Sequence, residues 1–314
     1  MKYAAASLLF FCSCCQIASA EDVSEQFSGH SLMVGVNRVQ QQLTFEQNDI
    51  DVAVAGRTLQ YQYFNGNWSG GVSLADSHGD KSGSGATAYQ LDLDGKSVAV
   101  FIEHTLRQIG NGTAWLGAGV GSATDEQSFV AQRFVQQRPA GSGDVTVESR
   151  FRSLSLDGGY SFLLDSSSIS VSAGLTQQWL HEEKRAVVRP VDRPEVIQQQ
   201  NTNEQTLIGG LSAGYEKYWL MNPELEFAVF AGARYQYTLG GDGQIHQSQL
   251  RRGARGVQQG QRSESFQQEN DSASALTLRL SLFFQQLNLA VEVDKFSDQS
   301  IADAYYGATA GLSF

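Results

Sequence analysis

Histidines are the residues of this 314-residue chain that are best suited to acid–base or metal chemistry, and there are five of them. His181 is followed by Glu182 and Glu183, so a histidine–carboxylate pair could form there for general acid–base work. His78 and Asp80 lie close together, but a metal centre needs more ligands than this segment provides. No motif around these residues adds a nucleophile or further ligands. The sequence therefore predicts no catalytic residue, no metal site, no cofactor and no enzyme.

Charged residues fall at every second position of several segments and alternate with apolar ones. In residues 225–239 the eight odd-numbered positions are all apolar or tyrosine, and the charges lie between them. A β-strand has period two, so such a segment presents one apolar and one polar face. This length of uncharged face exceeds that of most half-buried soluble strands and favours a wall between lipid and a wet lumen. The charges that we expect to face the lumen are Glu226, Arg234, Arg279, Glu292 and Asp294.

The last ten residues repeat this pattern. Tyr306, Leu312 and Phe314 belong to an apolar face, and the positions between are mostly small or polar. The segment resembles the closing strand of Gram-negative outer-membrane β-barrels, in which a terminal aromatic residue is part of the assembly signal. The resemblance implies that these three residues form that signal here. The alternative is the last strand of a soluble sandwich.

The first twenty residues are typical of a secretion signal. Lys2 precedes an apolar run at 4–11, and Ala18 and Ala20 provide the small-x-small pattern of a cleavage site. The run is too short to span a bilayer as a helix. Lipidation is the alternative, but the residues before the cysteines match that pattern only in part. All cysteines lie in this segment, so the exported chain would hold no disulfide: Cys12, Cys14 and Cys15.

Composition excludes several classes of protein. The formal net charge is −11, which disfavours nucleic acid as a partner. After the signal no run of about 18 apolar residues occurs, which argues against transmembrane helices. Only four prolines occur, which fits long hydrogen-bonded strands.

Short and long connections alternate along the chain, and this predicts an all-β, transmembrane, antiparallel up-and-down barrel. We expect twelve strands, with fourteen and ten as alternatives, a first strand near 31–39 and both termini in the periplasm. Residues 88–94 could form a separate hairpin arm that turns at Asp94-Gly95-Lys96. The expected short turns are Asn65–Asn67, Ile109–Gly112, Asp165–Ser167, Met221–Pro223 and Gln285–Gln286, and the expected loops are 40–51, 77–96, 126–147, 183–200, 240–271 and 297–302.

Aromatic residues and cations are expected near the two ends of the strands. Aromatic side chains beside short turns favour a girdle at the lipid headgroups. Cations of two loops could bind lipopolysaccharide phosphates, although a merely solvated loop explains them as well. The aromatic residues are Tyr61, Tyr63, Trp68, Tyr160, Phe162, Tyr215, Tyr218 and Trp219, and the cations are Lys184, Arg185, Arg189, Arg193, Arg251, Arg252, Arg255 and Arg262.

Strand number, termini and the closing phenylalanine together resemble the translocator β-domain of autotransporters. The chain is expected to contain a signal peptide (1–20), a periplasmic segment (21–30) and a barrel (31–314) in the Gram-negative outer membrane. Few residues precede the first strand, so an exported passenger is not evident. We expect a structural or surface-interaction barrel whose polar lumen is plugged by side chains. A small-solute channel is the alternative, followed by a passenger-less translocator or an outer-membrane hydrolase.

The resemblance also implies partners. These are outer-membrane lipid and lipopolysaccharide, periplasmic chaperones and the barrel-assembly machinery, with no nucleic acid. The sequence predicts no oligomeric state.

Overall fold

The computed structural model describes residues 28–45, 48–85, 87–135, 138–191, 193–253, 256–267, 272–297 and 304–314. The predicted signal peptide and cleavage site, Ala18 and Ala20, lie outside these residues. No helix in the described part is long and apolar enough to cross a membrane. The strands are β1 (Ser28–Phe45), β2 (Asn48–Asn65), β3 (Trp68–Gly83), β4 (Thr87–Ile109), β5 (Gly112–Val135), β6 (Arg138–Leu164), β7 (Ser167–Pro190), β8 (Glu195–Asn222), β9 (Leu225–Gly253), β10 (Gly256–Gln267), β11 (Ser272–Phe284), β12 (Leu287–Phe296) and β13 (Ala304–Ser313).

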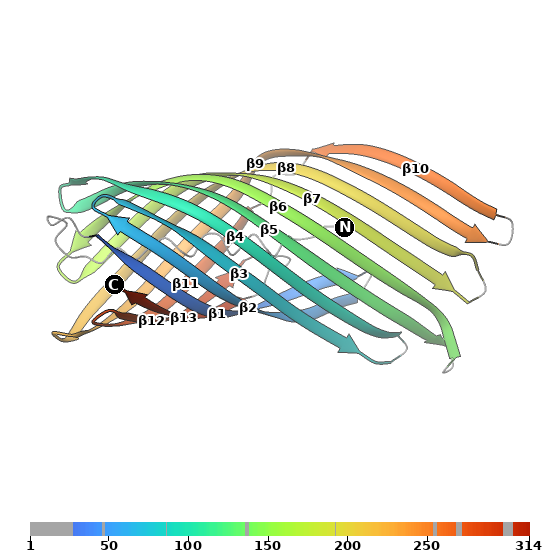
Figure 1. Cartoon of the computed structure of the whole chain (residues 1–314), viewed down its shortest axis with the longest axis horizontal. Helices are drawn as coiled ribbons and strands as arrows, with labels where there is room; N and C mark the ends of the chain where they lie inside the picture. Colours follow the sequence, from blue (N-terminus) through green and yellow to red (C-terminus); the bar gives the residue numbers. More distant parts are fainter. Residues whose placement is uncertain are drawn as a thin grey trace.

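Twelve of these strands form one closed antiparallel barrel (Figure 1). Neighbours in sequence pair with one another, and β13 pairs with β1 to close the ring. The extra strand, β10, pairs with the distal half of β9, whereas β11 pairs with the proximal half. The predicted fold and the strand number of twelve are therefore confirmed.

Tight turns connect the strands at one end of the barrel, which we call the short-turn end. Gly66, Gly110 and Gln285 adopt positive φ angles of 59°, 63° and 52° in three of these turns. Glycine adopts this region without steric cost, which explains two of the three positions. All five predicted short turns are present, at 66–67, 110–111, 165–166, 223–224 and 285–286. Outer-membrane barrels place such turns in the periplasm.

The opposite end, which we call the distal end, differs from the prediction of long loops. Most of the residues expected in long loops continue the strands, and β6, β8 and β9 reach 27, 28 and 29 residues. Crossing a bilayer takes only about 9–11 residues per strand, so the sheet projects well beyond the membrane. Residues 298–303 lie outside the described part. Loops predicted at 40–51, 77–96, 126–147, 183–200 and 240–271 are thus wrong over most of their length.

The expected turn at Asp94-Gly95-Lys96 is also wrong, whereas residues 88–94 are a strand as expected and pair with residues 78–83 in a hairpin. Residues 88–94 and the expected turn at Asp94-Gly95-Lys96 lie within the uninterrupted strand β4, paired with β3 and β5. The reason is local packing. A Cβ at Gly95 would lie 2.5 Å from Oγ of Ser77 and 2.7 Å from a carboxylate oxygen of Asp125, so glycine is needed for close approach rather than for a turn.

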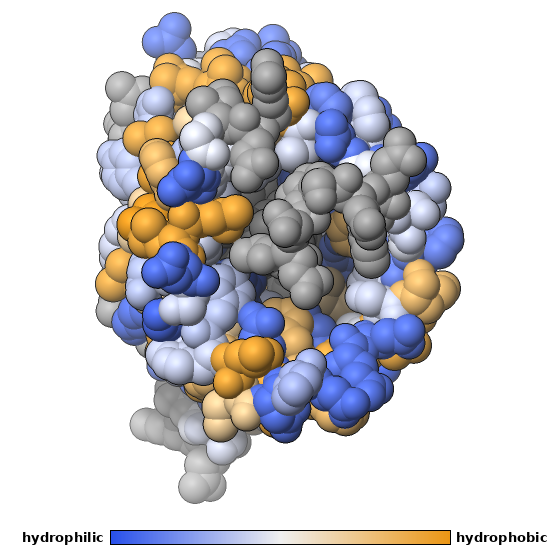
Figure 2. Space-filling model, turned by 90° about the vertical axis from the view of Figure 1, so that its left-hand side faces the viewer, coloured by the Kyte–Doolittle hydropathy of each residue, from blue (hydrophilic) through white to orange (hydrophobic). Residues whose placement is uncertain are grey.

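A band of apolar side chains covers the outside of the barrel near the short-turn end. On β4, Val98, Val100 and Ile102 are 39–50% exposed, while the residues between them point into the ring. Most other barrel strands carry similar residues at the same height. Exposed leucine and valine in such number suit lipid rather than water. Seen from the short-turn end, apolar and polar residues both gather around the rim (Figure 2).

Above this band the pattern inverts. On the same strand β4, Leu91 and Leu93 face inward and are 0% and 7% exposed, while Asp92 and Asp94 face outward. A strand surrounded by water buries its apolar face, whereas one surrounded by lipid exposes it. The inversion therefore marks where each strand leaves the bilayer.

Candidate functional site: the barrel interior

The interior at the height of the membrane is divided into two unlike walls. The inward positions of β3, β5 and β7 are mostly glycine, alanine, serine and threonine. Those of β8, β9, β11 and β12 include charged and aromatic side chains. Examples of the small residues are Gly71, Ser73, Gly119, Gly121, Ser170 and Ser172.

A charge cluster occupies the second wall. A guanidinium nitrogen of Arg279 lies 3.5 Å from a carboxylate oxygen of Glu216, and the guanidinium stands 4.9 Å from the centre of the Phe230 ring. The hydroxyl of Tyr218 donates a hydrogen bond of 2.6 Å to the other oxygen of Glu216. All four side chains belong to β8, β9 or β11, so the cluster joins three neighbouring strands on one side of the interior.

A second ion pair lies beside it. A guanidinium nitrogen of Arg234 is 3.9 Å from a carboxylate oxygen of Asp294, and these side chains are 17% and 4% exposed. Glu292 pairs across the strands with Arg279. Glu226 also lies at an inward-facing position of β9 and interacts with another residue. The five predicted lumen charges therefore gather on β9, β11 and β12, opposite the wall of small residues.

Sequence reasoning missed Glu216, Glu103 and Asp157. Glu103 of β4 and Asp157 of β6 flank Gly117, so carboxylates also lie between the small residues of β3, β5 and β7. A Cβ at Gly117 would lie 3.0 Å from a carboxylate oxygen of Asp157. Each of the three carboxylates directly follows an outward apolar or aromatic residue of its strand (Ile102, Leu156 or Tyr215), so the alternation that identified Arg234 could have found them.

Above the membrane band one side of the interior is apolar, while on β6–β8 the buried inward positions include Ser149, Glu182 and Thr202. One buried cluster joins Ile50, Val52 and Val54 of β2 to Leu91 and Leu93 of β4, across Gly79 of β3. The aromatic rings of Tyr89 and Phe129 pack against it. We call these residues the inner cap: Ile50, Val52, Val54, Tyr89, Leu91, Leu93 and Phe129.

A second buried cluster continues the inner cap around the ring. Val39, Ala275 and Phe296 pack with Tyr305, and Val39 pairs across the strands with Val54 of the inner cap. Together the two clusters form an apolar arc that includes β11–β13, β1, β2, β4 and β5. The arc adjoins the interior charges at β11, where Ala275 pairs across the strands with Arg234.

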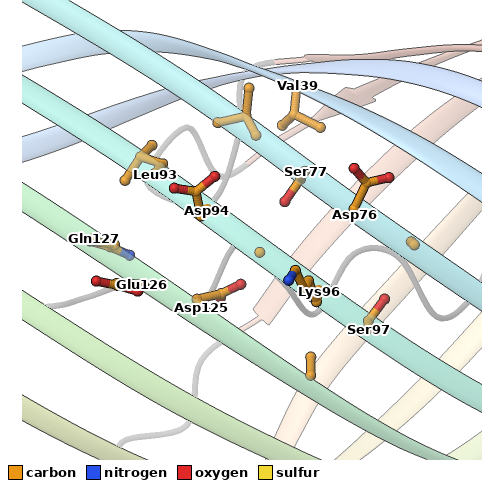
Figure 3. Close-up of a pocket in the computed structure, with 14 residues that line it drawn as sticks. Val39, Asp76, Ser77, Leu93, Asp94, Lys96, Ser97, Asp125, Glu126 and Gln127 are labelled. Carbon is orange, nitrogen blue, oxygen red and sulfur yellow. The ribbon is translucent and has the colours of Figure 1, made fainter.

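A small pocket opens where the polar interior meets the inner cap (Figure 3). It has a volume of about 50 Å³ and is lined by Val39, Leu93, Ser77 and Asp125, among others. Thr124 and Glu126, beside Asp125, are exposed on the outer face above the apolar band. Burial raises the pKa of Asp125 to about 6. This pocket could hold a few water molecules or one small polar group.

The histidines occupy other positions. His181 has Asn203 at 2.7 Å from Nδ1 and Glu183 at 3.2 Å from Nε2, and these hydrogen bonds raise its pKa. Nδ1 of His78 is 2.8 Å from Asp94. Both rings lie on the outer face at the distal end, far from the charge cluster. Within the described strands no group of three histidine, cysteine or acidic residues could hold a metal ion.

Aromatic side chains surround the short-turn end. The ring of Phe314 stacks on His30 at 5.6 Å, and the backbones of these two residues exchange two hydrogen bonds of 2.8 and 2.9 Å. His104 stacks on Trp68 at 4.1 Å, close to the first short turn. Tyr218 is an exception to the predicted girdle, because it points inward to Glu216. Tyr306 and Leu312 lie on the outer face of β13, 46% and 47% exposed.

Two solved structures are similar to the whole barrel. The translocator domain of autotransporter NalP from Neisseria meningitidis aligns with a TM-score of 0.61 at 12% identity, over 93% of this chain and 90% of that one. The β-domain of the Bordetella autotransporter BrkA aligns with a TM-score of 0.56 at 13% identity, over 92% of this chain and 99% of that one. No protein-family model and no curated protein matches the sequence. The chain thus has the fold of an outer-membrane β-barrel of the autotransporter translocator type.

Proposed function

We propose that this chain is a closed outer-membrane barrel that acts at the cell surface, as a structural element or as a partner in surface interactions. Three features support this role. The charge cluster around Arg279 and Glu216, together with the neighbouring ion pair of Arg234 and Asp294, fills part of the interior. The inner cap makes part of the distal interior apolar, and the extended strands carry the sheet beyond the membrane.

The inner cap is the main observation in favour of a closed barrel. An apolar lining is a poor path for hydrated solutes, because each solute would shed water without regaining hydrogen bonds. An open porin-like channel would instead keep polar residues along the whole interior. The inversion of the strands at Leu91 and Leu93 therefore favours a barrel that is closed at its distal end.

A small-solute channel remains the second candidate. The wall of glycine, alanine and serine on β3, β5 and β7 favours it, because small side chains leave room for water along that side. The translocator names of the two similar structures add a third reading, passage of a polypeptide. We also propose export by a signal peptide at 1–20 and insertion by the barrel-assembly machinery through Tyr306, Leu312 and Phe314.

Conductance in planar lipid bilayers tests the closed state. We expect the purified barrel to be silent, and the inner-face double variant Leu91→Ser/Leu93→Ser to show stable conductance steps. The matched control is Asp92→Asn/Asp94→Asn, which alters the outer face of the same strand and should stay silent. Heat-modifiable migration on gels verifies that all three proteins are folded. Stable steps from the unaltered barrel would favour the channel instead.

A further inference from the structure

A group of cations and hydroxyls lies on the outer face of the barrel, immediately above the apolar band. We call it the cationic patch: Lys96 of β4, Ser122 and Thr124 of β5, and Arg150 and Arg152 of β6. All five side chains are exposed. Strand pairing sets their arrangement, because Lys96, Thr124 and Arg150 are consecutive cross-strand neighbours, and Ser122 lies opposite Arg152.

The spacing of the patch suits a phosphate group. Directly opposed side chains on neighbouring strands are about 5 Å apart, and residues two apart on one strand are about 7 Å apart. Arg150 and Arg152 therefore stand on one side of the two hydroxyls, and Lys96 on the other. Guanidinium groups match phosphate oxygens with paired hydrogen bonds, and hydroxyl groups add further donors.

The two arginines are available for such a ligand. Within the described residues no carboxylate lies within ion-pair distance of Arg150 or Arg152. Asp76 of β3 is the direct cross-strand neighbour of Lys96, and four more acidic side chains lie one rung above the patch on β4–β7. A ligand phosphate is thereby confined to the patch, between these carboxylates and the lipid: Asp94, Glu126, Glu148 and Glu183.

The surface below the patch suits acyl chains. Val98 is level with Ser122, and Val100, Val120, Leu154 and Leu156 lie one or two rungs below the patch on the same strands; all five are 39–60% exposed. Trp179 pairs with Arg152 at the boundary, where an amphipathic ring is favoured. The cationic patch and the apolar surface are thus adjacent at the height of the outer-leaflet headgroups.

We propose that the outer face of β4–β6 binds a phosphorylated, multiply acylated glycolipid of the outer leaflet, of the lipid A class, with its phosphate held by Arg150, Arg152 and Lys96. This site is distinct from the distal cations predicted from sequence. Of those, Arg189 is already held by Asp144 and Glu195. The proposal does not depend on whether the interior conducts.

Binding of fluorescent lipid A to the full barrel in detergent tests the site. The double variant Arg150→Gln/Arg152→Gln should weaken binding by roughly tenfold or more, because charge-assisted hydrogen bonds are lost. Arg262→Gln on β10 is the matched control, since Arg262 is exposed and pairs with Glu264 away from the membrane; it should bind like the unaltered protein. Lipid A without its phosphates should bind the unaltered protein as weakly as complete lipid A binds the double variant.

Several outcomes would overturn the proposal. Equal binding of phosphorylated and dephosphorylated lipid would show that the acyl surface alone is responsible. Displacement by millimolar inorganic phosphate would indicate a general anion site rather than a lipid site. An equal loss in the Arg262→Gln control would point to overall charge. Heat-modifiable migration shows whether each variant is folded, and Arg150→Lys/Arg152→Lys, which keeps the charge but removes the guanidinium forks, should bind with intermediate affinity.

Discussion

At the scale of single residues, small side chains decide where charges can lie inside this barrel. Gly95 leaves space for the carboxylate of Asp125, and Gly117 leaves space for that of Asp157. Any other residue at these positions would force the neighbouring carboxylates to move. The positions of these interior carboxylates therefore depend on the space that the neighbouring glycines leave, as well as on the residues that the carboxylates contact.

Asp125 makes the stability of the barrel depend on pH. Burial raises its pKa from 3.8 to about 6, so ionisation is easier in the unfolded chain than in the folded one. Its stabilising share is complete below pH 3.8 and is lost as the pH rises through 6. We expect Asp125→Asn to be more stable than the unaltered barrel at pH 7, by about 1–3 kcal/mol.

Unfolding in urea with lipid vesicles, measured at pH 4 and pH 7, checks this prediction. The difference between Asp125→Asn and the unaltered barrel should nearly vanish at pH 4. Glu126→Gln is the control, because Glu126 is exposed on the outer face of the same strand. A difference that did not change with pH would argue against the role of Asp125.

At the scale of elements, a single strand meets two different surroundings. On β4 the residues from Val98 to Ile102 expose their apolar face, and those from Leu91 to Asp94 bury it. Strand pairing continues without a break through this change. The strand is therefore held by its ladder throughout, while the side chains adapt to lipid below and to water above.

Substitutions along β4 test this division. Leu91→Ala should cost about 2–4 kcal/mol, because it opens a cavity in the inner cap. Asp92→Ala, one position away on the exposed face, should change stability by less than about 0.5 kcal/mol. Val100→Arg should cost about 2–4 kcal/mol in the lipid band. Urea unfolding in vesicles measures all three, and equal effects of Leu91→Ala and Asp92→Ala would refute the inverted faces.

At the scale of the whole molecule, the barrel is a membrane-spanning ring with a tall distal wall. The long strands β5–β9 carry this wall, and β10 adds to it beside β9 (Figure 1). The wall bears exposed charges on the outside, and its inner face buries both apolar side chains such as Val147 and polar ones such as Glu182. It is a folded sheet in a part of the chain where loops were expected from the sequence.

Cysteine labelling on intact cells checks the orientation of this wall. Gln132→Cys, exposed near the distal end of β5, should react with a membrane-impermeant maleimide. Val120→Cys lies in the apolar band and should not react, and Asn67→Cys in a short turn should react only after the cells are broken. The unaltered protein is the background control. Labelling of Asn67→Cys but not of Gln132→Cys on intact cells would reverse the proposed orientation.

The sequence by itself determined the barrel, its twelve strands, its short turns and the alternation that separates two faces. Alternation such as that of residues 225–239 and turn residues such as Gly66 are local, so they can be read from neighbouring positions alone.

Only the tertiary structure decided which face points inward at each height. A period of two is the same for Leu91 and for Val98, and it does not say whether water or lipid lies outside. Whether a residue is surrounded by water or by lipid depends on how far its strand rises above the membrane. Strand pairing across the whole sheet sets that height. For the same reason the inner cap, the pairing of Arg279 with Glu216 and the cationic patch emerged only once strands distant in sequence were placed side by side.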